Sequence, residues 1–168
     1  MAGRGQSDWL ADPMGSPVPA SVADLVVLLA RLGVAKVDWV GTSMGGLIGL
    51  GVASLRDRAG GALVRRLVLN DVGPALGADA IQRIGSYVGA PKRFGSVEEA
   101  ADYLWGISTG FGPHTREQWL ALTAPQLRAV NDAQGAGFVP HYDPRIGLPF
   151  KAVTPQLAAA GEALLWQR

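Results

Sequence analysis

The chain has 168 residues, of which 48% are hydrophobic and 17% are charged, and its formal net charge is +1. This length suffices for one domain with a substantial core, and the composition is globular rather than disordered. A nearly neutral chain is not expected to bind nucleic acid or an anionic membrane surface. Cysteine is absent, which excludes disulfides, thiolate metal sites and a cysteine nucleophile, and fits a reducing compartment.

The first predicted elements are a helix, a strand and a second helix. A polar loop at residues 3–9 leads into a helix that is expected to start at the Ser21/Asp24 capping pair and to stop at Gly33. Residues 37–40 alternate as in a strand, and apolar residues recur at helical spacing from 44 to 55. No apolar stretch is long enough to span a bilayer and no secretory signal is evident, so a soluble cytoplasmic protein is expected.

Between the strand and the second helix stands Gly41-Thr42-Ser43-Met44-Gly45. A serine on a sharp strand-to-helix turn brings backbone and side chains close together, so small residues are needed two positions before and after it. Gly41 and Gly45 fill both places. The order strand, turn, helix therefore favours a serine hydrolase that transfers acyl groups.

The remaining elements follow from residue 65 onward. Arg65 and Arg66 precede the apolar run 67–70, which is predicted to be a strand covered on both faces. Helix, strand, helix, strand indicates an α/β fold with a parallel sheet. Beyond residue 74 no further strand is predicted, only short helices around 81–88, 96–107 and 115–122, the last two with capping boxes, and a final helix from Thr154 to Arg168.

Three segments in this order resemble the α/β-hydrolase superfamily, and most nearly its esterase-like members with a helical cap: Gly3 to Asp8, Gly41 to Gly46 and Leu69 to Pro74. The resemblance covers essentially the whole chain but only a central portion of the family's fold. It implies a partial core with the serine turn at residues 1–75, a helical cap at 76–150, and a helix returning toward the core at 151–168.

The resemblance also implies a mechanism. Ser43 would be the nucleophile that attacks a carboxylic ester or related acyl substrate to form an acyl-enzyme, and the backbone N–H of Met44 would donate to the oxyanion. The second oxyanion donor, the catalytic histidine and the acid are expected outside this chain. The expected partner is a small acyl substrate, no cofactor or metal is expected, and the oligomeric state is left open.

Other candidate residues have structural interpretations. His114 and His141 lie in the expected cap and lack the Gly-His loop that the family uses, so both are expected to be structural or surface residues. Asp71 is interpreted as a turn or cap-anchoring carboxylate, with the orientation of a catalytic base as the alternative. The tryptophans are expected to pack the core and the cap; the alternative is that they line an acyl pocket, in which case Trp105 and Trp119 are the two expected to touch substrate.

A second hypothesis is that the chain is a catalytically silent remnant or an interaction module. Two strands alone would leave unpaired sheet edges and an uncovered apolar face, which favours aggregation. The 168-residue chain by itself is therefore predicted to be inactive and poorly soluble.

Overall fold

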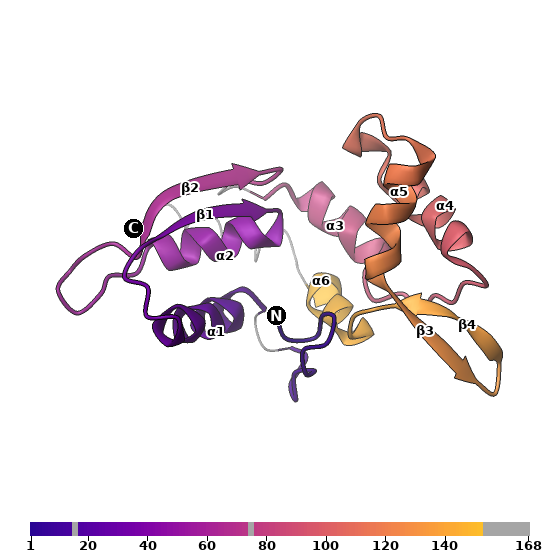
Figure 1. Cartoon of the computed structure of the whole chain (residues 1–168), viewed down its shortest axis with the longest axis horizontal. Coiled ribbons are helices and arrows are strands. Elements are labelled where there is room, and N and C mark those ends of the chain that lie inside the picture. Colours follow the sequence, from indigo (N-terminus) through magenta and orange to yellow (C-terminus); the bar gives the residue numbers. More distant parts are fainter. Residues whose placement is uncertain (15–16, 74–75, 153–168) are drawn as a thin grey trace.

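The chain folds into an α/β part followed by a mostly helical part that carries a β-hairpin (Figure 1). The computed structural model describes residues 1–14, 17–73 and 76–152. The elements of the first part, which we call the α/β part, are α1 (Pro17–Arg31), β1 (Val37–Thr42), α2 (Met44–Ala53) and β2 (Val64–Asn70). Those of the second, which we call the C-terminal part, are α3 (Ala78–Tyr87), α4 (Val97–Ile107), α5 (Arg116–Thr123), β3 (Leu127–Asp132), β4 (Gly135–Pro140) and α6 (Leu148–Ala152), with 3-10 turns at Thr109–Phe111, Ala124–Gln126 and Pro144–Gly147.

β1 and β2 form a parallel pair with α2 on one face, which confirms the predicted order of helix, strand, helix and strand. Ile48 and Val52 of α2 are fully buried. A side chain at Gly49 of α2 would overlap Trp39 of β1 and Leu67 of β2, so helix and sheet approach closely there. The core of this part therefore lies between α2 and the sheet, with α1 packed against α2.

The other face of this sheet is open within the described residues. Val40 and Val68 pair across the two strands, and their side chains are 74% and 54% exposed. The prediction that the second strand is covered on both faces is therefore wrong for the described chain. The physical reason is that successive strand residues point to opposite faces, and α1 adds its contacts to α2 rather than to the open face.

The first helix starts earlier than predicted and ends where expected. α1 begins at Pro17, so Ser21 lies inside the helix and is buried instead of capping it. Proline fits the first helical turn because it has no N–H to satisfy and a fixed φ. At the other end, Gly33 has a φ of 66°, and the amides of Gly33 and Val34 donate to the carbonyls of Ala30 and Leu29 in a Schellman arrangement.

The C-terminal part confirms one of its two predicted capping boxes, because at α4 the Glu99 carboxylate accepts from the Gly95 amide instead of the Ser96 amide, and it corrects the prediction that no strand follows residue 74. Ser96 caps α4 by accepting from the Glu99 amide, and Thr115 and Gln118 cap α5 reciprocally. β3 and β4 form an antiparallel hairpin with a register from Leu127 opposite Pro140 to Asp132 opposite Gly135. The predicted helix from Thr154 to Arg168 lies outside the described residues.

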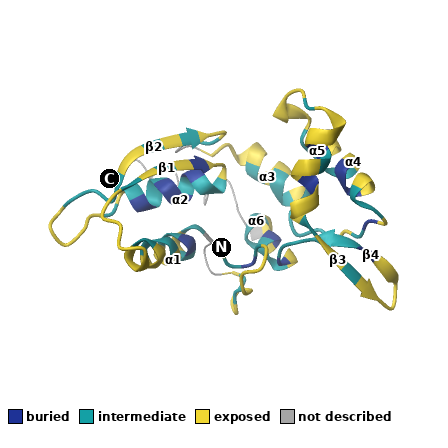
Figure 2. Cartoon of the chain, in the orientation of Figure 1, coloured by how far each residue is buried: buried dark blue, intermediate teal, exposed yellow. Residues whose placement is uncertain are grey.

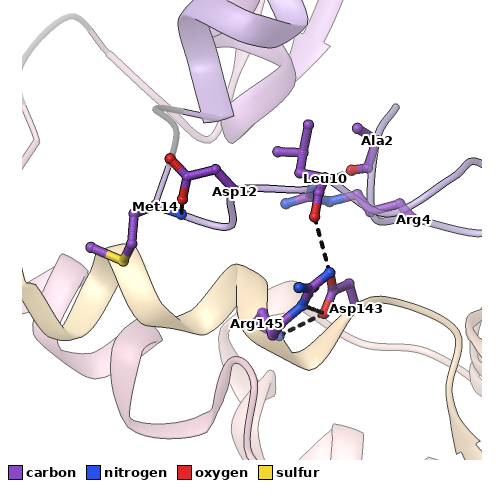
Figure 3. Close-up of polar contacts among 7 residues, drawn as sticks. All are labelled: Ala2, Arg4, Leu10, Asp12, Met14, Asp143 and Arg145. Atoms are coloured by element: carbon purple, nitrogen blue, oxygen red, sulfur yellow. Dashed lines mark hydrogen bonds and ion pairs between the residues drawn. The ribbon is translucent and has the colours of Figure 1, made fainter.

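The N-terminal loop joins the two parts. The Gly5 amide donates to the His141 carbonyl at 2.9 Å, and the Asp143 amide donates to the Gly3 carbonyl at 2.8 Å. Figure 3 shows the Arg145 guanidinium between the Asp143 carboxylate and the Leu10 carbonyl, which it contacts at 2.9 and 3.0 Å. Loop residues 3–10 are therefore held against the segment that precedes α6.

Candidate functional site

Ser43 occupies a strained turn between β1 and α2. Its φ and ψ are 50° and −122°, and within the described chain only Ser43 and Asp71 combine a side chain with positive φ. Such a conformation costs on the order of 1–3 kcal/mol and persists only where the surroundings hold it. Here the Ser43 amide donates to the Asn70 carbonyl at 3.0 Å, and the Ser43 carbonyl accepts from the Gly46 amide at 2.9 Å. The sharp strand-to-helix turn that the sequence predicts is present.

Two glycines near the turn leave no room for a side chain, and only one of them is a position that the sequence predicted. A Cβ at Gly41 would overlap the backbone of Gly45 and Gly46, so no side chain fits there. A Cβ at Gly45 would meet no described atom within 4 Å, so the steric reason predicted for Gly45 is wrong within the described residues. Gly46 is the crowded residue instead, because a Cβ there would overlap the Val72 side chain.

The Ser43 hydroxyl is accessible. The residue is exposed and its side chain does not cap α2. Among the described residues it makes no side-chain hydrogen bond that would occupy the hydroxyl. Met44 is the first residue of α2, so its amide is one of the four that find no carbonyl within a helix, at the end where the helix dipole favours negative charge.

The two histidines contact residues other than Ser43. His114 Nδ1 is 3.1 Å from the Gly112 carbonyl oxygen, and its ring lies edge-on to Trp119 with centroids 5.6 Å apart. The backbone of His141 bonds to Gln126 and to Gly5. In the described part of the chain neither imidazole is hydrogen-bonded to Ser43, so the structure supplies no general base at the serine from these two residues.

Asp71 and the two tryptophans also have defined places. Asp71 directly follows β2 with a φ of 53° and is exposed. Trp119 is 6% exposed, its indole N–H donates to the Ala101 carbonyl at 2.7 Å, and its ring meets that of Trp105 edge-on at 5.2 Å. Trp119 therefore packs inside the C-terminal part, in agreement with the packing interpretation, whereas Trp105 is 38% exposed.

Arg4 is a neighbour of the serine turn that the sequence did not single out. One guanidinium nitrogen, Nη2, is 3.5 Å from the Met44 Sδ, and Nη1 is 3.4 Å from the Ala2 carbonyl oxygen. Burial lowers the pKa of Arg4 from its usual value. Its proximity to Met44 depends on the pairing of residues 3–5 with 141–143, a contact distant in sequence that no local pattern reveals.

No group of three or more His, Cys, Asp or Glu side chains is arranged to hold a metal ion in the described part. Among the same residues, none of the helices has the length and apolar character needed to cross a membrane.

Comparison with known proteins shows which hydrolases this chain is similar to. No protein-family model matches the chain. It is 53% identical over 167 residues to a 3-hydroxybutyrate-oligomer hydrolase of Cupriavidus necator, covering 99% of this chain and 56% of that protein. The chain thus spans about half the length of this curated relative.

Solved structures agree with this relationship. An α/β hydrolase of Novosphingobium aromaticivorans superposes with a TM-score of 0.76 at 32% identity over 98% of this chain and 57% of that one. E-2-(acetamidomethylene)succinate hydrolase, at 19% identity, shares the fold with a TM-score of 0.74 over 98% of this chain and 55% of that one. The chain thus has the fold of the α/β hydrolases. What it holds is one part of that fold: a small parallel sheet with its helices and the segment that follows.

Proposed function

We propose that this chain carries the nucleophile of a serine hydrolase that acts on carboxylic esters, with Ser43 as the attacking residue. The observation that carries the proposal is the serine turn: an exposed hydroxyl on a residue held at positive φ between a parallel strand and a helix. Strain of this kind concentrates at functional sites, and the Ser43 side chain is exposed and not packed among the residues that the structure describes.

In the proposed mechanism, Ser43 Oγ attacks the ester carbonyl carbon while a base accepts its proton. The carbonyl oxygen becomes an oxyanion that accepts from the Met44 amide at the start of α2. Collapse of this intermediate expels the alcohol and leaves an acyl group on Ser43, and water then releases the acid. The base and a second oxyanion donor would come from outside the described residues.

The substrate class we propose is short oligomers of 3-hydroxyacids. Support comes from the relative of Cupriavidus necator, whose name states that it hydrolyses 3-hydroxybutyrate oligomers. Identity of 53% over 99% of this chain makes a shared substrate class the simplest proposal. The alternative is a catalytically silent interaction module, favoured by the lack of a base bonded to Ser43 among the described residues.

A chimera separates these two functions. In it, the present chain replaces the aligned segment of the Cupriavidus necator enzyme, which supplies the rest of the fold. We expect the folded chimera to hydrolyse 3-hydroxybutyrate oligomers and a nitrophenyl ester, and Ser43→Ala to lower the rate about 10⁴-fold or more. Ser54→Ala is the matched control, because Ser54 is an exposed serine at the end of the same helix.

The outcome that rejects the proposal is a chimera with a cooperative melting transition that hydrolyses neither ester. Covalent labelling adds a second measurement: a fluorophosphonate should modify Ser43 in the chimera, located by mass spectrometry of the labelled peptide. Turnover that persists after Ser43→Ala would assign the chemistry to another residue.

A further inference from the structure

The β-hairpin of the C-terminal part has one open edge. β4 is paired on both sides, with β3 on one side and with Phe94 on the other, where Phe94 and Phe138 exchange backbone hydrogen bonds of 2.9 and 2.8 Å. Within the described chain β3 pairs with β4 only. Figure 1 shows the hairpin projecting away from the rest of the molecule, and Figure 2 shows its far end exposed. Among the described residues the outer edge of β3 is therefore unpaired, and another strand can form backbone hydrogen bonds with it.

The backbone hydrogen bonds of Phe138 define which backbone groups point outward from β3. The N–H and C=O of Phe138 are both used by Phe94, so Ala129, opposite Phe138, forms a non-hydrogen-bonded pair in the hairpin. Hydrogen-bonded and non-hydrogen-bonded pairs alternate along an antiparallel ladder. The amide and carbonyl groups of Leu127, Ala129 and Asn131 therefore face the open edge. The bond from the His141 amide to the Gln126 carbonyl fits the same alternation.

We propose that two copies of this chain associate by antiparallel pairing of their β3 edges about a two-fold axis at Val130. In this register Ala129 of each copy exchanges both outward hydrogen bonds with Asn131 of the other. Val130 lies opposite Val130 of the second copy, and Arg128 lies opposite Asp132 of the second copy. The occupant of the edge is thus a second copy of this chain, in an isologous contact.

Charge selects this register over its neighbours. Arg128 and Asp132 are both exposed, and Arg128 forms no ion pair with any described residue. Asp132 already binds Arg93 at 3.0 Å, but a carboxylate can accept from a second arginine. Moving the axis to Ala129 would put Arg128 opposite Val130, and moving it to Asn131 would put Arg128 opposite Gln134. Only the axis at Val130 gives both cross-copy ion pairs.

A single introduced cysteine tests the axis directly, because the chain has no cysteine of its own. Opposite residues of a non-hydrogen-bonded pair have Cα atoms about 4.5 Å apart, within the range that a disulfide spans. Under mild oxidation Val130→Cys is expected to form at least tenfold more covalent dimer than Ser86→Cys, an exposed control on α3. Equal dimer from the two variants overturns the proposal.

Charge reversal tests the register in the same background. Arg128→Glu combined with Val130→Cys should lower the yield of covalent dimer at least fivefold, because each glutamate would face Asp132 of the other copy. Arg83→Glu makes the same charge change at an exposed position on α3 and should leave the yield unchanged. A dimer yield that Arg128→Glu does not lower, relative to Arg83→Glu, contradicts the proposed pairing.

Discussion

Gly41 and Gly45 flank Ser43 symmetrically in sequence, but the structure predicts opposite effects for alanine at the two positions. At Gly41 the added Cβ would overlap the backbone atoms of Gly45 and Gly46, which no side-chain rotation relieves. Overpacking against backbone typically costs 1–3 kcal/mol, and the serine turn would have to open to accept it, so we expect Gly41→Ala to destabilise by about 3 kcal/mol.

Alanine at Gly45 meets no described atom within 4 Å, and Gly45 lies within α2. Alanine is favoured over glycine inside a helix by about 0.5–1 kcal/mol, so Gly45→Ala should be neutral or stabilising. A symmetric reading of the motif would instead make both substitutions destabilising. The two variants therefore differ by about 3–4 kcal/mol in expected free energy of unfolding.

Urea unfolding followed by tryptophan fluorescence measures this difference. Trp39 is a suitable reporter because its indole N–H donates to the Gly45 carbonyl at 3.0 Å, directly beneath the turn. Equal midpoints for Gly41→Ala and the unmodified chain would refute the close approach of β1 and α2. A loss of stability in Gly45→Ala as large as in Gly41→Ala would refute the open space at Gly45.

Two further predictions concern the ion pair of the buried Asp143 with Arg145 and the open sheet face. Asp143 is 1% exposed, and Arg145 beside it lowers the pKa of the carboxyl, so Asp143 contributes stability above its unfolded pKa that is lost as pH falls through the lower folded pKa. Asp143→Asn should therefore lower the melting temperature at pH 7 and flatten the loss of stability below about pH 4, measured by thermal melts across pH. Val40→Thr with Val68→Thr should increase the soluble yield and change the unfolding free energy by less than about 0.5 kcal/mol, because both side chains are exposed. An unchanged yield would mean that aggregation does not start at this face.

The elements that sequence predicts correctly are those with local signals. The starts of α4 and α5 are each marked within four residues, by Ser96 with Glu99 and by Thr115 with Gln118, and both helices start there. These capping contacts lie within a few positions of each other, so a linear pattern suffices. The serine turn also has a local signal in residues 37–46, but the bond from the Ser43 amide to the Asn70 carbonyl that helps to hold it comes from the next strand.

The hairpin was missed because its stabilising contacts are distant in sequence. β3 and β4 contain several alanines and glycines, which have low strand propensity, and the turn residues Ala133 and Gln134 are not a typical hairpin pair. Stability comes from Phe94 pairing with Phe138 and from Arg93 binding Asp132, across about 40 residues. Arg4 was overlooked for the same reason, because only the fold brings it to Met44.

The contacts that fix the geometry of the serine turn all come from one part of the chain. Backbone hydrogen bonds to Asn70 and Gly46 and the close approach of Gly41 fix its geometry, and all of these belong to the α/β part. Among the described residues, hydrogen bonds connect the C-terminal part to the N-terminal loop, where Arg4 touches the Met44 side chain and not its amide. Changes in the C-terminal part should therefore leave the position of the hydroxyl and of the Met44 N–H intact. In the proposed hydrolase, the geometry of attack is thus set by β1, α2 and β2.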